Sequence, residues 1–236
     1  MTRTIAAGAL AVFCAGCSVE GTDPGELGNG AFTYSCAGAT DAWCETPFRH
    51  GGRPLPAIAA PFAVTYDDTA IGSAQIVSAS PSRLALSRGR FAFLAPGPAA
   101  LLARDSTGIV RDFFHLAGSP IAGIELVRIR PGQLEGAAPS QQLAVDPWSI
   151  EPLVVLAMRA GETATLFGYP VADSGDVLTG SATWSFAIEP AGVAALHGVE
   201  GDNVIAVEAL APGEATLRVR AGNAERVVAM HVEVGP

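Results

Sequence analysis

The chain has 236 residues, of which 49% are hydrophobic and only 16% charged, and its net charge is −9. A disordered protein needs low hydrophobicity and high net charge, so this composition excludes one and allows a sizeable buried core. All 14 basic residues are arginines, and even the densest group, Arg83, Arg88 and Arg90, forms no stripe that could neutralise phosphates, which excludes nucleic-acid binding.

Residues 1–16 have the pattern of an export signal. Arg3 gives a short positive start, and Ile5 to Phe13 form an apolar stretch of nine residues. About 20 apolar residues are needed to span a bilayer, so this stretch is too short for a transmembrane helix. Small residues follow it, as a signal-peptide cleavage site requires, and residues 1–16 are therefore predicted to be a signal peptide.

The cleavage site resembles the lipobox of bacterial lipoproteins. Ala15, Gly16 and Cys17 match its two small residues and lipid-bearing cysteine, whereas Cys14 stands where leucine is usual. The resemblance implies lipidation (diacylglyceryl, with palmitate-type acylation) of Cys17 and attachment to a membrane. The alternative is an ordinary secretory signal with an incidental Cys17. Ser18, which is not aspartate, implies sorting to the outer membrane, with a periplasmic or surface-facing orientation.

Residues 17–30 are rich in glycine after the lipidated Cys17 and are predicted to form a flexible tether. Two further cysteines follow at Cys36 and Cys44. An exported protein meets an oxidising compartment, so we predict a disulfide between them. Metal ligation is the alternative, but zinc needs four ligands and His50 is the one histidine nearby. No cofactor is predicted.

An internal repeat divides the rest of the chain. Leu94–Ala103 contains a Pro-Gly turn followed by alternating apolar residues, and Leu210–Val219 repeats this pattern 116 residues later. That offset equals about one sandwich domain plus a linker. We therefore predict an all-β protein with two tandem immunoglobulin-like β-sandwich domains, residues 31–120 and 121–236. A linker open to proteases is expected near 118–123 or near 131–142, where Gly, Pro and Ser cluster.

Regular short strands separated by turn residues support this fold class. In the first copy, Asp67-Asp68 is expected to end the first strand and 105–108 to form a hairpin turn. The predicted strands are 62–66, 91–94, 100–103, 109–116, 124–129, 154–158, 163–167, 182–188, 204–209, 215–219 and 227–234.

The second copy resembles group 2 bacterial Ig-like domains. The residues that carry this likeness are Ala160–Leu166, Ala182–Ser185, Leu210–Leu217 and the closing strand at 227–234. The resemblance covers roughly residues 150–236. Trp184 alternates with Ala182 and Phe186 on one strand face, so we predict a core residue; a ligand platform is the alternative.

No catalytic motif is present. The sequence lacks the HExxH, CxxC, GxSxG and phosphate-loop patterns, and we predict no catalytic or metal-binding residues. Asp67 and Asp68 should point to opposite faces of a strand, which excludes a shared carboxylate site. Asp173–Asp176 has the composition of a turn, and weak calcium binding there is the alternative.

The sequence therefore predicts a non-enzymatic cell-envelope lipoprotein whose Ig-like domains act as a structural spacer or interaction module. Its partners would be the membrane, through the lipid, and an unidentified protein or glycan. The alternative is a surface adhesin or carbohydrate-binding protein, for which Trp43, Trp148 and Tyr169 are the loop aromatics available. A hydrolase ranks third.

Overall fold

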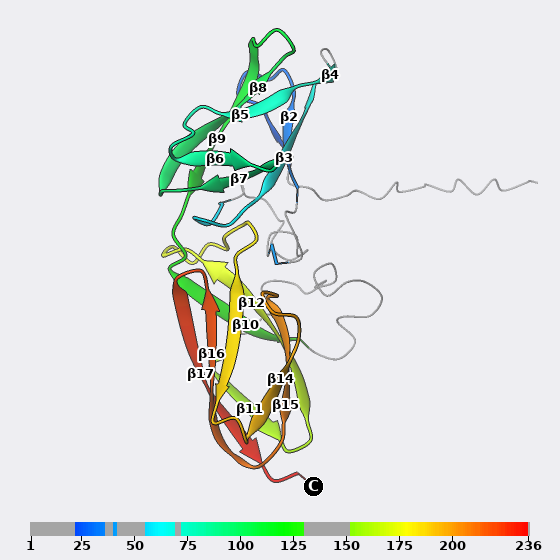
Figure 1. Cartoon of the computed structure of the whole chain (residues 1–236), viewed down its shortest axis with the longest axis vertical. Helices are drawn as coiled ribbons and strands as arrows, with labels where there is room; N and C mark the ends of the chain where they lie inside the picture. Colours follow the sequence, from blue (N-terminus) through cyan, green and yellow to red (C-terminus); the bar gives the residue numbers. More distant parts are fainter. Residues whose placement is uncertain (1–21, 36–39, 42–54, 69–71, 130–151, 236) are drawn as a thin grey trace, which may run out of the picture.

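The computed structural model describes residues 22–35, 40–41, 55–68, 72–129 and 152–235. Two β-sandwiches follow one another along the long axis of the molecule (Figure 1). The described residues form strands and turns, and within them no helix is long and apolar enough to cross a membrane. The prediction of an all-β fold with tandem sandwiches is confirmed.

The second sandwich has the strand order of an immunoglobulin domain. One sheet has the order β10-β12-β15-β14 and the other β11-β17-β16-β13, with β11 parallel to β17. These are the ABED and GFC sheets of the constant-type fold, with β10 as strand A and β11 added at the edge of the GFC sheet beside β17. The strands are β10 (Gly123–Ile129), β11 (Val155–Arg159), β12 (Thr163–Val171), β13 (Trp184–Glu189), β14 (Ala194–His197), β15 (Val204–Ala209), β16 (Gly213–Ala221) and β17 (Ala224–Glu233).

The first sandwich repeats this order with shorter strands. One sheet has the order β5-β8-β9, and a bridge between Phe62 and Phe91 places the β6-β7 hairpin beside β3 in the other layer. The strands are β1 (Thr22–Pro24), β2 (Ala31–Ser35), β3 (Ala63–Asp68), β4 (Gly72–Ser73), β5 (Gln75–Ser78), β6 (Leu84–Ser87), β7 (Arg90–Phe93), β8 (Gly97–Arg104) and β9 (Val110–Gly118).

The repeat seen in the sequence marks equivalent strands. Gly97 begins β8 and Gly213 begins β16, and each glycine has a positive φ at the turn that opens its strand. In both strands the buried side chains then alternate with more exposed ones, which builds the core face of each sandwich.

Three expectations are corrected by the strand boundaries. Asp67 and Asp68 do not follow the strand but are its last two residues, because β3 ends at Asp68; Asp68 is buried and Asp67 exposed, as opposite faces require. Residues 22–30 are not a free tether, because Thr22–Pro24 form β1 and pair with β2. Residues 118–123 are not a free linker, because Ser119 and Ala122 donate backbone hydrogen bonds to Pro56 and Val171, although Pro120 and Ala122 are exposed. The other predicted linker region, 131–142, lies outside the described residues.

Candidate functional site

The three cysteines predicted to carry chemistry, Cys17, Cys36 and Cys44, lie outside the described residues. Trp43, Trp148 and His50 also lie outside them. The lipidation, the disulfide and two of the three candidate loop aromatics therefore stay predictions.

Trp184 and Tyr169 are both described, and neither is exposed as a ligand platform would be. Trp184 begins β13 with 1% of its surface exposed and stacks with Phe186 at a centroid distance of 6.4 Å. The core assignment of Trp184 is confirmed. Tyr169 was expected in a loop, and this was wrong: it lies within β12 and is 9% exposed. The burial of its ring raises the pKa of Tyr169 to about 12, and Glu125 adds to the rise.

The described histidines form pairs with glutamates at the surface. His115 contacts Glu26 at 2.8 Å and His197 contacts Glu208 at 2.7 Å, and His231 pairs with Glu214. Each imidazole is exposed, and none is hydrogen-bonded to a Ser or Thr hydroxyl among the described residues, as a nucleophile–base pair would require.

Acidic side chains also form no metal centre in the described part of the chain, where no group of three potential ligands converges. The turn predicted at Asp173–Asp176 is present: Ser174 Oγ donates to the Asp176 carboxylate at 2.6 Å, the Gly175 amide donates to the Ala172 carbonyl, and the Ala172 amide donates to the Asp176 carbonyl. The carboxylate of Asp176 therefore stabilises the turn by accepting this hydrogen bond from Ser174.

Backbone hydrogen bonds join the two sandwiches where they meet. Residues 55–61 come just before β3. They are hydrogen-bonded on one side to Ser119 and on the other to residues 179–181 of the second sandwich. The backbone of Thr179 donates to Leu55 and accepts from Ala57, both at 2.9 Å, and Ser181 donates to Pro61 at 2.9 Å. A piece of the first sandwich is therefore paired like a strand with the second.

Asp41 is the acidic centre of this junction. It is 0% exposed, and its carboxylate accepts hydrogen bonds from the Tyr34 hydroxyl at 2.8 Å and from the Gly180 amide at 2.9 Å. A bridge also links Asp41 to Ser181. A buried carboxylate is tolerated only when it is hydrogen-bonded, so Asp41 depends on groups from both sandwiches. Burial, and then the charge of Asp41, raise the pKa of Tyr34 well above 10, which keeps the phenol a donor.

Gly180 fits this junction because it has no side chain. Its φ is +99°, and an added Cβ would lie 2.9 Å from Ala60 Cβ and 3.0 Å from the Ala60 carbonyl oxygen. Both the backbone conformation and the space favour glycine here. Ala57 and Ala60 complete the contact by packing into the core of the second sandwich.

A second buried acid fixes the N-terminal hairpin to the first sandwich. Asp112 of β9 accepts hydrogen bonds from the amides of Leu27 at 2.8 Å, Asn29 at 2.9 Å and Gly30 at 3.2 Å. Glu26 adds hydrogen bonds between its carboxylate and both the amide and the imidazole of His115, three residues further along β9. Residues 25–30 are thus held to β9 by side chain and backbone together.

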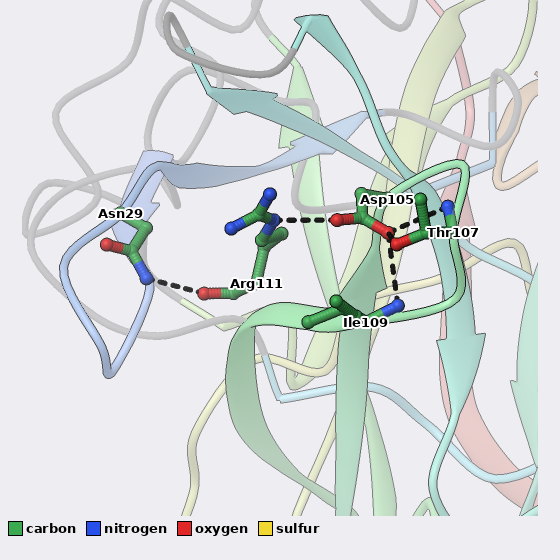
Figure 2. A network of polar contacts seen from close by, with 5 residues as sticks. All are labelled: Asn29, Asp105, Thr107, Ile109 and Arg111. Atoms are coloured by element: carbon green, nitrogen blue, oxygen red, sulfur yellow. Dashed lines mark hydrogen bonds and ion pairs between the residues drawn. The ribbon is translucent and has the colours of Figure 1, made fainter.

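The neighbouring hairpin between β8 and β9 is organised by Asp105 (Figure 2). Its carboxylate accepts from the Thr107 hydroxyl at 2.6 Å, from the Thr107 and Ile109 amides, and from Arg111 at 2.8 Å. The Thr107 hydrogen bond is the largest cause that lowers the pKa of Asp105 to about 2. Asn29 donates to the Arg111 carbonyl, so Figure 2 also shows how the hairpin meets the N-terminal segment.

These features define a class: a two-domain protein of immunoglobulin-like β-sandwiches whose buried polar groups join structural segments to one another. No protein-family model matches the chain. No curated protein matches it either.

Several solved structures are similar to the chain at low identity. A fragment of the S-layer protein SbsC, domains 4 and 5, is 14% identical, with a TM-score of 0.33 over 71% of this chain and 82% of that one. The Escherichia coli adhesin FdeC is 11% identical, with a TM-score of 0.35 over 78% and 62%. Yersinia pseudotuberculosis InvD is 13% identical, with a TM-score of 0.31 over 76% and 55%. The chain spans 24% of a longer SbsC structure. The assignment of the fold rests on the strand order of the two sandwiches and does not depend on these similar structures.

Proposed function

We propose that this chain is a non-enzymatic cell-envelope lipoprotein whose two sandwiches act as a structural spacer and interaction module. The observation that carries the proposal is the junction: Asp41 and residues 55–61 of the first sandwich are hydrogen-bonded to residues 179–181 of the second. Two domains joined in this way keep one relative orientation, as a spacer requires, whereas a bare linker lets domains move independently.

The envelope location rests on the sequence, with Cys17 as the lipid-bearing residue and the outer membrane as its destination. The burial of Trp184 and Tyr169 favours a spacer over a carbohydrate-binding platform, since a sugar stacks on exposed rings. Asp41 and Asp112, the acids buried most completely, are both engaged with backbone amides, which supports a structural use.

The test has two arms. Wild type and Cys17→Ser are expressed with a labelled fatty acid; we expect label and membrane fractionation in the wild type alone, and equal label in both would contradict lipidation. The soluble fragment 18–236 is then incubated with envelope extracts and a glycan array. Capture of an envelope protein supports the interaction module, and specific glycan binding would instead support the adhesin.

A further inference from the structure

The β11-β17-β16-β13 sheet of the second sandwich has an outer face on the side away from the core. Buried residues alternate along its strands with more exposed ones, and the more exposed ones form this face. Register places Val155 of β11 beside Ala229 of β17, and Ala229 beside Thr216 of β16. We call this surface the outer GFC face. Its uncharged inner members are Val155, Ala157, Ala187, Thr216, Val227 and Ala229.

The middle of the outer GFC face is apolar and nearly flat. The outer face of a sandwich sheet ordinarily meets water and carries polar side chains. Here Val155 is 51% exposed and Val227 is 55% exposed. The methyl groups of Ala157 and Ala229 lie beside them and are also exposed. Side chains this small project little above the backbone, so a second sheet can approach to the usual distance of about 10 Å.

Opposite charges lie at the two ends of the outer GFC face. At the end near the β16-β17 turn, two arginines share one glutamate, which leaves one positive charge in excess. At the other end, two glutamates stand against one arginine, and with His231 neutral this leaves one negative charge in excess. The Glu214 side chain at this second end is 74% exposed. The first end consists of Arg218, Arg220 and Glu225, and the second of Arg159, Glu214 and Glu233.

We propose that a second copy of this chain packs face to face on the outer GFC face, related to the first by a two-fold axis. The axis lies in the plane of the face, perpendicular to the strands and at the level of Thr216. Arg218 and Glu214 stand two positions on either side of Thr216, on the same face of β16. The axis therefore lays Arg218 of each copy over Glu214 of the other. This contact occurs twice, because a two-fold interface is isologous.

The same axis brings the apolar middle of the two faces together. Ala229 and Val155 lie in one row with Thr216, so each meets its own counterpart at the level of the axis. The basic end of each copy then faces the acidic end of the other, and this favours the antiparallel arrangement over a parallel one. Glu189 is in the same row but on the edge strand β13, at the rim of the contact. The proposal goes beyond the proposed function, because it needs neither the lipid nor another envelope protein.

The size of the outer GFC face indicates a weak dimer. From Glu225 to Glu233, β17 advances eight positions, roughly 26 Å at about 3.3 Å per residue. Four strands at about 4.8 Å each make the face roughly 19 Å wide. Two such faces bury roughly 1,000 Å² in total, which is the lower limit for a specific interface. We therefore expect a reversible dimer and not an obligate one.

Sedimentation equilibrium at increasing protein concentration measures self-association of the full chain with Cys17→Ser, which cannot be acylated at that residue. We expect a reversible equilibrium between monomer and dimer. Ala229→Arg puts two like charges at the axis and should weaken the dimer about tenfold or more. Thr163→Arg, at an exposed position of the other sheet, is the matched control and should leave the dimer unchanged. A chain that stays monomeric, or a dimer that both substitutions affect alike, would overturn the proposal.

Charge reversal provides a second test, which a folding defect cannot imitate. Arg218→Glu alone sets two glutamates against each other at both contacts, and Glu214→Arg alone sets two arginines against each other. Each variant should therefore dimerise about tenfold more weakly or worse. In an equimolar mixture of the two variants, every contact again joins an arginine and a glutamate, so a heterodimer should form with close to wild-type affinity. A mixture that associates no better than the separate variants would overturn the proposal.

Discussion

The two sandwiches share a strand order but fill their cores with different side chains. The first is built on a group of stacked and tilted rings that includes Phe32, Phe62, Phe93 and Phe114. The second has one fully buried ring, Trp184, among aliphatic residues and alanines, with the half-buried Phe186 stacked on it. A sandwich of this kind can therefore be built on a core of several aromatic rings or on a core with one fully buried ring.

The sandwiches also differ in their buried polar groups. Asp41, Asp68 and Asp112 are buried acids of the first sandwich, whereas Thr179 and Asn203 are the uncharged counterparts in the second. We expect the first sandwich to depend on its carboxylate hydrogen bonds and the second on the fit around its tryptophan.

The largest effect is expected from Trp184→Ala. Removing a buried aromatic ring costs about 3–5 kcal/mol, because the sandwich loses apolar burial and gains a cavity. Urea unfolding followed by circular dichroism measures the change. Phe186→Ala is the control on the same strand face, and its half-buried ring should cost clearly less. If Trp184→Ala keeps its unfolding midpoint and instead loses binding to a glycan or protein, the ligand-platform alternative replaces the core assignment.

Asp112→Ala should be the most damaging polar substitution in the first sandwich. It leaves the amides of Leu27, Asn29 and Gly30 without their acceptor, and an unsatisfied buried group costs about 1–3 kcal/mol. Hydrogen exchange should show faster exchange over residues 25–30. Asp173→Ala, in an exposed turn, should change stability by less than about 0.5 kcal/mol. Unchanged protection of residues 25–30 would show that the hairpin does not depend on Asp112.

Gly168→Ala tests the fit around the tryptophan. An added Cβ would lie 2.7 Å from Trp184 Cζ3, and overpacking of this kind costs about 1–3 kcal/mol. Gly192→Ala is the matched control, because nothing lies within 4 Å of its added Cβ and its φ is not positive. Thermal unfolding of both variants is compared, and the melting temperature of Gly168→Ala should be the lower one. Equal melting temperatures would mean that the Trp184 ring can move to make room for the added Cβ.

Tyr34→Phe tests the junction with a smaller change. It removes one hydrogen bond to Asp41, which corresponds to about 0.5–1.5 kcal/mol. The expected result is a lower unfolding midpoint together with faster amide exchange at Gly180, on the far side of the junction. A lower midpoint with unaltered exchange at Gly180 would restrict the role of Tyr34 to the first sandwich.

The smallest effect is expected from acid titration of Asp105. The folded pKa of about 2 lies below the ordinary 3.8, so the Asp105 carboxylate stabilises the fold above pH 3.8, and this contribution is lost as the pH falls towards 2. Unfolding of the wild type and Asp105→Asn is compared between pH 5 and 2. The difference between them should shrink as the pH falls, and a constant difference would contradict the linkage.

The sequence predicted those parts of the fold that depend on local pattern. Residues 204–209 are a short apolar run and form β15 with the predicted bounds, and the alternation of Ala182, Trp184 and Phe186 placed Trp184 in the core. The strands β5 and β14 were not predicted, because each has only four residues and no strict alternation. Tyr169 was misplaced because the predicted strand ended at residue 167, whereas β12 continues through Gly168 and Pro170 to Val171.

The junction could not be predicted from local pattern. Asp41 and Gly180 are 139 positions apart, and neither stands in a motif that indicates the other. Asp112 likewise looked like an ordinary strand residue, and its role follows from the return of residues 27–30 to β9. Such contacts depend on tertiary packing, which composition and spacing do not encode.

The position of β1 has a consequence for distance from the membrane. If Cys17 carries the lipid, as we propose, only residues 18–21 separate it from Thr22, where β1 begins. The five residue-to-residue steps from Cys17 to Thr22 span at most roughly 18 Å, at about 3.3–3.6 Å each. The N-terminal hairpin would then stand close to the lipid headgroups, and a large partner would approach the second sandwich more easily than the first.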